Sequence, residues 1–278
     1  MDAPPLDPGL YIVATPIGNL GDITRRAVQV LEACDIVACE DSRVTGKLLN
    51  HLAIKKPMRR YDDHASEAAR ESLLAEMVQK AVVLVSDAGT PLISDPGYRL
   101  VRAARERGIA ITSLPGPSAA ITALTLAGLP TDRFLFAGFL PSKAKARDDA
   151  MAELAALKAT LVFYESGPRL VATLEAMATG LPGRELAVAR ELTKTFEECR
   201  TGPVQDLVAH YTAHPPRGEI VVLAGPPAAT PAPDVASLDD ELLAALADLP
   251  TSKAAAQVAK AHGLDRKALY ARALELKA

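Results

Sequence analysis

Short apolar runs alternate with segments of helical periodicity through the first half of the chain. Runs of strand length occupy residues 10–14, 36–39, 81–86 and 109–114. Amphipathic, helix-period segments lie between them at residues 23–31, 65–80 and 97–107. This alternation predicts an α/β domain with a mostly parallel sheet covered by helices on both faces.

A second series of alternating segments follows. Strands are predicted at residues 133–139, 160–164, 185–190 and 219–224, and helices at 119–128, 147–157 and 168–178. We expect the boundary between the two α/β units near Pro115–Ser118, where prolines and a glycine interrupt both patterns.

The last fifty residues follow a different pattern. Pro226, Pro227, Pro231 and Pro233 give residues 225–233 the composition of a linker. Three short helices are predicted beyond it, at 238–249, 252–262 and 265–276, with Gly263 ending the second and Asp265 capping the third. The expected domains are 1–116, 117–227, a linker at 228–236 and a helix–turn–helix tail at 237–278.

Composition and charge limit the possible functions. The 278 residues are 49% hydrophobic and 23% charged, with a net charge of −3, which argues against a protein that binds nucleic acid over its whole surface. Residues 251–278 nevertheless carry six basic and two acidic side chains, a local net charge of +4. The three cysteines form no CxxC pair, the N-terminus lacks a signal-peptide pattern, and the longest apolar stretch is too short to cross a bilayer. We therefore expect a cytoplasmic protein without a membrane partner.

Four loops rich in glycine, proline and small polar residues follow predicted strands. They span residues 15–22, 86–97, 114–118 and 165–168. Ligands bind at the carboxyl ends of strands in such folds, and glycines allow a ligand to approach the backbone. No P-loop and no GxGxxG motif is present, so a neutral slot for a nucleoside with a cationic group is favoured over a phosphate site. Asp87 is suited either to bind an amine or ribose hydroxyl or to cap a turn.

Two further clusters are candidates for chemistry. Glu40, Asp41 and Arg43 follow a predicted strand and are either catalytic or a solvated ion-pair cluster. Arg190 to Lys194 end another strand and are either functional or structural. The five histidines lack metal-ligand spacing with cysteines or acids, so we expect no metal.

Several long blocks resemble the ribosomal small-subunit methyltransferase I group of the tetrapyrrole methylase superfamily. They include LYIVATPIGNLGDIT from Leu10, VSDAGTPLISDPGYRLV from Val85, LPGPSAA from Leu114, RFLFAGFLP from Arg133, TLVFYESGPRL from Thr160, ARELTKTFEE from Ala189 and GEIVVLAG from Gly218. The resemblance covers about residues 10–225, and the tail is similar to that group's C-terminal helix–turn–helix. The group commonly has His-Asn where this chain has Asp63-His64-Ala65-Ser66, so no role is given to that position.

The resemblance implies a tetrapyrrole-methylase-like fold of two α/β domains with a small helical appendage. It implies a homodimer that binds S-adenosylmethionine between the domains and methylates the 2′-hydroxyl of a cytidine in the decoding region of 16S rRNA, within the 30S subunit. By position, the cofactor would contact Ile17, Asp87, Gly89, Thr90, Leu92, Ser118, Ala119, Tyr164, Ala224 and Gly225.

The catalytic roles are the least constrained part of this interpretation. A ribose hydroxyl is a poor nucleophile at neutral pH, so a base is expected. We favour a carboxylate from Glu40 or Asp41, with Lys194 as a further catalytic candidate. Arg43, Arg190, Arg266 and Lys267 are expected to bind the RNA substrate. Two alternatives remain open: a small-molecule methylase acting on a tetrapyrrole precursor, and a non-catalytic regulator that binds nucleic acid.

Overall fold

In the computed structural model, the described residues are 5–62, 65–228, 235–262 and 264–277. They form two compact units, Met1–Pro227 and Ala228–Ala278. The sequence observations on Asp63, His64, Pro231, Pro233 and Gly263 concern positions outside the described residues.

The first unit begins with a sheet of five parallel strands. They are β1 (Gly9–Val13), β2 (Ile36–Cys39), β3 (Met58–Arg60), β4 (Ala81–Val85) and β5 (Ile111–Leu114), in the order β3-β2-β4-β1-β5. Every residue of β2 and β4 is buried, as expected for strands covered on both faces. The predicted parallel sheet is therefore confirmed.

Helices cover both faces of this sheet. They are α1 (Arg25–Ala33), α2 (Ser42–His51), α3 (Glu67–Met77) and α4 (Tyr98–Glu106). Alternate strand residues separate the two cores: Val37 and Val83 pack with α1 and α2, while Leu84 packs with α3 and α4. Because a strand's side chains alternate between faces, one apolar strand supplies both cores.

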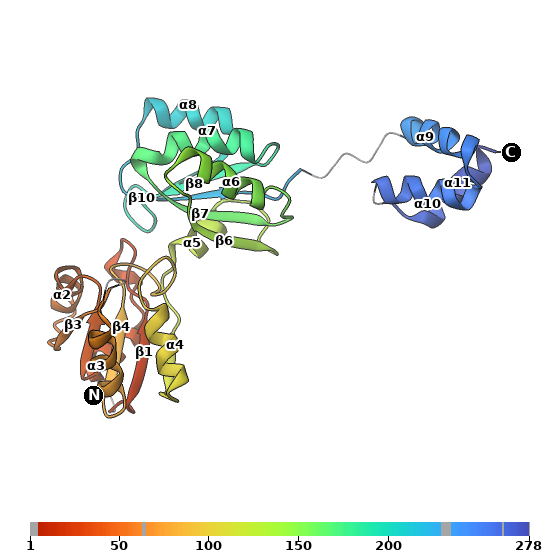
Figure 1. The fold of residues 1–278 in the computed structure, drawn as a ribbon. Coiled ribbons are helices and arrows are strands. Elements are labelled where there is room, and N and C mark those ends of the chain that lie inside the picture. The colour runs from red at the N-terminus through yellow and green to blue at the C-terminus, as the bar shows by residue number, and fades with distance from the viewer. Residues whose placement is uncertain (1–4, 63–64, 229–234, 263, 278) are drawn as a thin grey trace. The chain divides into compact units, whose positions relative to one another are not determined.

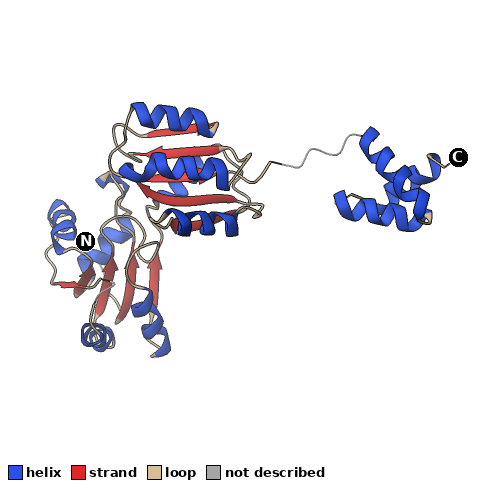
Figure 2. Ribbon diagram, turned by 45° about the horizontal axis from the view of Figure 1, so that its top comes forward, coloured by secondary structure: helices blue, strands red, loops and turns tan. Residues whose placement is uncertain are grey.

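A second sheet completes the first unit (Figure 2). Its strands are β6 (Phe134–Phe139), β7 (Thr160–Ser166), β8 (Leu186–Arg190), β9 (Glu198–Gly202) and β10 (Glu219–Ala224), in the order β6-β7-β10-β8-β9. Only β6 and β7 are parallel, because β9 turns back along β8 and β10 runs between β7 and β8 in the opposite direction to both. The second sheet is thus mixed rather than mostly parallel.

The helices of this half are distributed unequally. The helices α6 (Ala144–Leu154), α7 (Leu170–Gly180) and α8 (Val204–Ala213) pack on one face around Phe163, Leu174 and Tyr211. The other face is covered by α5 (Ala119–Leu126), which contributes Ala123 and Leu124 to a smaller core (Figure 1).

The second unit contains three helices around its own core. They are α9 (Val235–Asp248), α10 (Thr251–His262) and α11 (Arg266–Glu275), packed around Leu242, Val258 and Leu269. Asp265 caps α11 as predicted, accepting a hydrogen bond from the Lys267 amide. No helix in the described part of the chain is both long enough and apolar enough to cross a membrane.

Candidate active site

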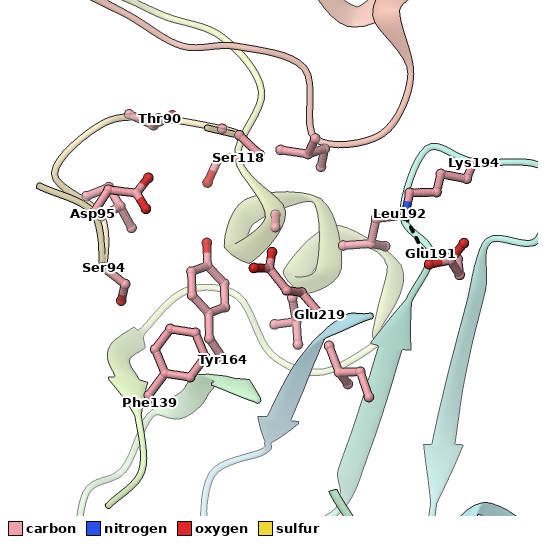
Figure 3. A pocket seen from close by; sticks show the side chains of 17 residues that line it. Thr90, Ser94, Asp95, Ser118, Phe139, Tyr164, Glu191, Leu192, Lys194 and Glu219 are labelled. Atoms are coloured by element: carbon pink, nitrogen blue, oxygen red, sulfur yellow. Dashed lines mark hydrogen bonds and ion pairs between the residues drawn. The ribbon is translucent and has the colours of Figure 1, made fainter. Parts of the chain in front are cut away.

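A cavity of about 350 Å³ lies in the first unit, where loops from both halves meet (Figure 3). Its lining residues are Ile17, Ala88, Gly89, Thr90, Ile93, Ser94, Asp95, Ser118, Ala119, Phe139, Tyr164, Glu191, Leu192, Lys194, Glu219, Ile220 and Val221. The loops that follow β1, β4 and β5 supply one side, and β6, β7, β10 and the turn after β8 supply the other. Its size is typical of small-molecule sites.

Backbone pairing brings the first two loops together. Thr15 and Gly89 exchange both amide hydrogen bonds, at 2.8 and 3.0 Å. Gly89 has φ +79°, and a Cβ there would lie 3.3 Å from Cγ2 of Ile17. The position therefore favours glycine both for its backbone conformation and for its close approach to Ile17.

The loop after β4 is tied to the loop after β5. The Thr90 hydroxyl donates a 2.9 Å hydrogen bond to the Pro117 carbonyl, next to Ser118 and Ala119 at the start of α5. Ile93, Ser94 and Asp95 line the cavity, whereas Leu92 packs against the core of the first sheet. A side chain expected to flank a ligand is therefore used for packing.

Phe139 and Tyr164 form the cavity wall contributed by β6 and β7, and Phe136 packs behind Tyr164. Tyr164 contacts Phe136 and Phe139 edge to face, with ring centroids 4.8 and 5.7 Å apart. Its hydroxyl points into the cavity between Asp95 and Glu219 (Figure 3). Burial raises the pKa of Tyr164, and the nearby charges of Asp95 and Glu219 raise it further, although the Ala120 amide opposes them. Tyr164 therefore remains a neutral hydrogen-bond donor at physiological pH.

The turn after β8 closes the opposite side. The Lys194 ammonium lies 3.0 Å from a Glu191 carboxylate oxygen. Glu191 and Thr193 have φ values of +49° and +64°, and the Thr193 amide donates a 2.6 Å hydrogen bond to Glu197. A Cβ at Gly18 would lie 2.8 Å from Cγ of Lys194, so this turn packs directly on the loop that follows β1.

A second cavity of about 230 Å³ lies on the other side of that loop. It is lined by Thr15, Pro16, Gly18, Leu20, Val44, Thr45, Lys47, Leu48, Ser86 and Asp87. Asp87 accepts a 3.1 Å hydrogen bond from the Asp41 amide. Asp41 caps α2 and pairs with Arg43 at 2.5 Å; the Arg43 side chain lowers the pKa of Asp41 to about 2.

The structure brings together only part of the expected site. Of the site residues expected from the sequence, those that line the first cavity are Ile17, Gly89, Thr90, Ser118, Ala119, Tyr164 and Lys194. Asp87 lines the second cavity, close to Asp41 and Arg43. Neither Glu40 nor Asp41 is among the residues lining the first cavity.

Four more of the site residues expected from the sequence do not line the first cavity. Ala224 and Gly225 are buried at the far end of β10, about 17 Å along the strand from Glu219 at the cavity. Gly225 is instead hydrogen-bonded to Glu185 and Arg184. Arg266 and Lys267 belong to the second unit, where Arg266 donates to Ser252.

Sequence reasoning missed several cavity residues. Glu219 opens the last strand, Asp95 lies inside the Gly/Pro-rich loop, and Phe139 ends β6. Asp95 could have been predicted from the sequence, since it belongs to a loop already expected to bind a ligand. Glu219 and Phe139 could not, because their neighbours follow from the strand order of a mixed sheet.

The charge of the first cavity distinguishes between ligand types. Three carboxylates line it, from Asp95, Glu191 and Glu219, against the single ammonium of Lys194. Such a lining suits a cationic ligand rather than a nucleotide phosphate. Together with two α/β halves and glycine-rich loops, this lining fits the class of methyltransferases that bind a sulfonium cofactor.

Comparison with known proteins agrees with this class. A family model described as Tetrapyrrole (Corrin/Porphyrin) Methylases matches residues 9–208, and a model described as RsmI C-terminal HTH domain matches residues 232–277. The chain therefore belongs to the tetrapyrrole methylases, which confirms the fold expected from the sequence. It is an enzyme, an S-adenosylmethionine-dependent methyltransferase.

Similar proteins cover nearly the whole chain. The Ribosomal RNA small subunit methyltransferase I of Erythrobacter litoralis is 61% identical over 99% of this chain and 98% of its own. The protein of the same name from Escherichia coli O157:H7 is 48% identical over 96% and 94%. A Thermus thermophilus uroporphyrin-III C-methyltransferase complexed with S-adenosyl homocysteine has a TM-score of 0.53 at 18% identity, over 77% of this chain and 96% of that one. At this identity it shows the fold alone.

The residues of the first cavity fit S-adenosylmethionine. Carboxylates face a space where a sulfonium and an ammonium group need compensation, and Tyr164 offers a neutral donor. The absence of a side chain at Gly89 leaves backbone accessible beside apolar Ile17. The first turn of α5 lacks a side-chain cap at Ser118 and presents backbone amides suited to a carboxylate, although the Ala120 amide is hydrogen-bonded to Tyr164.

Proposed function

We propose that this chain transfers a methyl group from S-adenosylmethionine to the 2′-hydroxyl of a cytidine in the decoding region of 16S rRNA, in the cytoplasm and within the 30S subunit. The supporting observation is the similarity, over nearly the full length of both chains, to proteins named Ribosomal RNA small subunit methyltransferase I. The helical tail is part of that similarity, since a separate family model matches it. A tetrapyrrole methylase would need only the first unit.

In this proposal the first cavity holds the cofactor, which supplies an electrophilic methyl group when bound. Ile17 and Gly89 would lie against its adenosine part, and the backbone amides at Ser118 and Ala119 would receive its carboxylate. Tyr164 and Glu219 orient its polar end. The main contribution of these groups is alignment, which places the methyl carbon in line with the attacking oxygen.

Proton removal from the ribose hydroxyl is assigned to Glu191. This carboxylate lines the cavity and is oriented by its ion pair with Lys194, whose ammonium acts as a cation that positions the carboxylate. Asp41 is a poor candidate for a base, because a carboxyl group whose pKa is about 2 holds a proton weakly. The assignment thus moves from the loop after β2, at Glu40 and Asp41, to the turn after β8.

RNA is held by basic groups outside the cofactor cavity. Arg43 is exposed to solvent beside the second cavity and forms an ion pair with Asp41. Arg266 and Lys267 are exposed at the start of α11 in the tail. These groups supply local attraction for phosphates in a chain whose net charge is −3.

The proposal includes a homodimer. Five large apolar side chains are exposed on α5 and on β6, the edge strand that follows it: Ile121, Leu126, Phe134, Leu135 and Phe139. Exposed apolar surface on an edge strand is a feature of protein–protein interfaces. Phe139 also lines the cavity, so a partner on this face would border the site.

The test is methylation with a radiolabelled cofactor. Unmethylated small subunits, naked 16S rRNA and a uroporphyrinogen-type tetrapyrrole are offered in parallel. Incorporation into RNA is expected, at a nucleotide whose 3′ phosphodiester resists alkaline hydrolysis because its 2′-hydroxyl is blocked. Label in an alkali-sensitive nucleotide would place the methyl on a base, and label in the tetrapyrrole alone would overturn the proposal.

A further inference from the structure

An open hollow of about 560 Å³ lies between the end of β8, β9 and the end of α8. We call it the arginine hollow; its lining residues are Arg190, Glu191, Phe196, Glu198, His210, Tyr211, His214, Pro215, Pro216 and Arg217. Glu191 also lines the cofactor cavity, so the two spaces share a wall. A polymeric substrate that enters the cavity past the turn after β8 would therefore reach the arginine hollow next.

The Glu198 carboxylate interacts with several basic side chains at the arginine hollow. Glu198 accepts a 3.0 Å hydrogen bond from Arg190, pairs also with Arg200, and lies 3.7 Å from His210. Arg217 is exposed and forms no ion pair with the rest of the described chain. Arg190 and Arg217 line the hollow, Arg200 pairs with Glu198 from outside the lining, and Glu191 is paired with Lys194. The excess positive charge suits an anionic ligand.

Aromatic surfaces accompany these cations. The side chain of Phe196 is 73% exposed. His210 stacks on His214, with ring centroids 4.8 Å apart and planes 25° apart, and contacts Tyr211 edge to face. Partial burial and the charge of Arg200 lower the pKa of His210, so its ring is uncharged at neutral pH and offers a flat neutral face. Cations beside open ring faces are the combination that binds single-stranded nucleic acid.

The wall of the hollow contains a buried hydroxyl group. Tyr211 is 1% exposed, lines the hollow, and its hydroxyl has no hydrogen-bond partner among the described residues. Burial raises the pKa of Tyr211 to about 12, so the hydroxyl keeps its proton and can donate it in a hydrogen bond. Buried polar groups are normally satisfied, and a phosphate oxygen or its bridging water would satisfy this one.

We propose that the arginine hollow binds the nucleotide adjacent to the methylated one in single-stranded RNA, with its phosphate on Arg190 and Arg217 and its base stacked on Phe196. This subsite rests on the proposed function. It provides the enzyme with a contact to the RNA strand beside the reacting ribose, and this contact does not involve the tail. Its role is to position the strand and not to take part in the chemistry.

The experiment measures binding of naked 16S rRNA and of unmethylated small subunits to full-length variants. Phe196→Ala and Arg217→Ala are each expected to weaken binding about ten-fold, because one stacked base or one phosphate contact is lost. Arg217→Ala should also reduce the slope of log affinity against log salt by about 0.7. Phe196→Trp should bind as well as the wild type, because tryptophan also stacks on a base. Arg102 is an exposed arginine on α4 paired with Glu106, and Arg102→Ala should leave binding unchanged.

The outcomes separate this inference from the proposed function. Wild-type protein that neither binds nor methylates either RNA would overturn the proposed function. Wild-type methylation with Phe196→Ala and Arg217→Ala indistinguishable from Arg102→Ala would overturn the subsite alone. Variants that lose binding to subunits but bind naked rRNA normally would assign the hollow to a ribosomal protein and would also overturn the inference. Unchanged affinity for S-adenosylmethionine in every variant is the check on folding.

Discussion

Five non-glycine residues in the described part of the chain have a positive φ, and four of them lie in loops around the cofactor cavity: Leu92, Ser94, Glu191 and Thr193. Each such conformation costs on the order of 1–3 kcal/mol and persists only where surrounding contacts enforce it. Here the contacts are visible. Leu92 is anchored in the first core, and the Thr193 amide is anchored by Glu197. The strain is therefore part of a preorganised site.

Gly89 permits a sharp test of the cofactor site. Gly89→Ala is expected to weaken S-adenosylmethionine binding about ten-fold or more, because the new methyl group would crowd Ile17 and shift the cavity wall. Gly108→Ala is the matched control, since Gly108 has φ +68° but open space around it. Both variants should lose about 1 kcal/mol of stability from the backbone. Equal calorimetric affinities for the cofactor in the two variants would remove Gly89 from the site.

The proton acceptor can be assigned by comparing carboxylates. Glu191→Gln is expected to lower the single-turnover methylation rate about 100-fold or more at saturating cofactor and RNA. Asp41→Asn and Glu40→Gln should remain near the wild-type rate, since neither residue lines the cavity and Asp41 has a pKa of about 2. Lys194→Met should give a smaller loss than Glu191→Gln. A normal rate for Glu191→Gln would show that alignment alone drives the transfer.

At the level of elements, the accuracy of the sequence predictions followed hydrophobic contrast. Four of the five strands of the parallel sheet, β1, β2, β4 and β5, are largely apolar runs and were predicted within about two residues. The elements that were missed are α2, β3, β9 and α8. The edge strands β3 and β9 carry polar residues such as Arg60 and Arg200, so they show no apolar run. They are held by backbone pairing with the preceding strand, β2 for β3 and β8 for β9, which a local apolar pattern does not reveal.

The same limit explains the errors at the site. Ile17, Gly89, Thr90 and Ser118 of the glycine-rich loops line the cavity, because composition marks such loops directly, whereas Asp87 and Leu92 do not line it. Ala224 and Gly225 lie away from the cavity because the direction of β10 depends on a mixed strand order that no local pattern encodes. The far end of β10 is held by Arg184, a buried arginine in the loop before β8.

Arg184 is expected to be a major source of stability for the second sheet. Its guanidinium donates to five backbone carbonyls, those of Leu154, Ala155, Leu157, Ala159 and Gly225. Arg184→Met would leave these acceptors without a partner and should lower the free energy of unfolding by about 3 kcal/mol or more. Urea denaturation measures the loss, with Arg102→Ala, an exposed arginine, expected to change stability by about 0.5 kcal/mol or less. A similar midpoint for both variants would contradict this role.

At the scale of the whole molecule, function depends on separating charges that nearly cancel. The net charge is −3, yet the first cavity has three carboxylates and one ammonium group, while residues 251–278 of the tail have a local net charge of +4. In the proposed function, the acidic groups compensate a cationic cofactor and the basic groups attract RNA where the strand lies. A uniformly basic protein would bind RNA everywhere along its surface and present the target ribose less often.

The apolar face of α5 and β6 predicts a dimer. In light scattering the protein should have about twice the mass of the 29.3 kDa chain. The double substitution Ile121→Asp and Phe134→Asp should yield monomers, because charged side chains are costly to bury in an interface. Val78→Asp, directly after α3 at a position 64% exposed, is the control and should leave the mass unchanged. A monomeric wild-type protein at micromolar concentration would refute the dimer.

The tail should contribute RNA affinity without contributing to cofactor binding. It has its own core, and Arg272 is held by Asp239 and Glu275, so its structure does not require the lysines. Lys253, Lys260, Lys267 and Lys277 are exposed. Changing the first three to glutamate in the full-length protein should weaken binding to small subunits at least ten-fold and flatten its salt dependence by about 0.7 per lost phosphate contact. Cofactor affinity should stay constant, because the first cavity is built entirely from the other unit. Truncation after Pro227 should reproduce both results, whereas full subunit affinity in the triple variant would show that the tail's charge is not used on RNA.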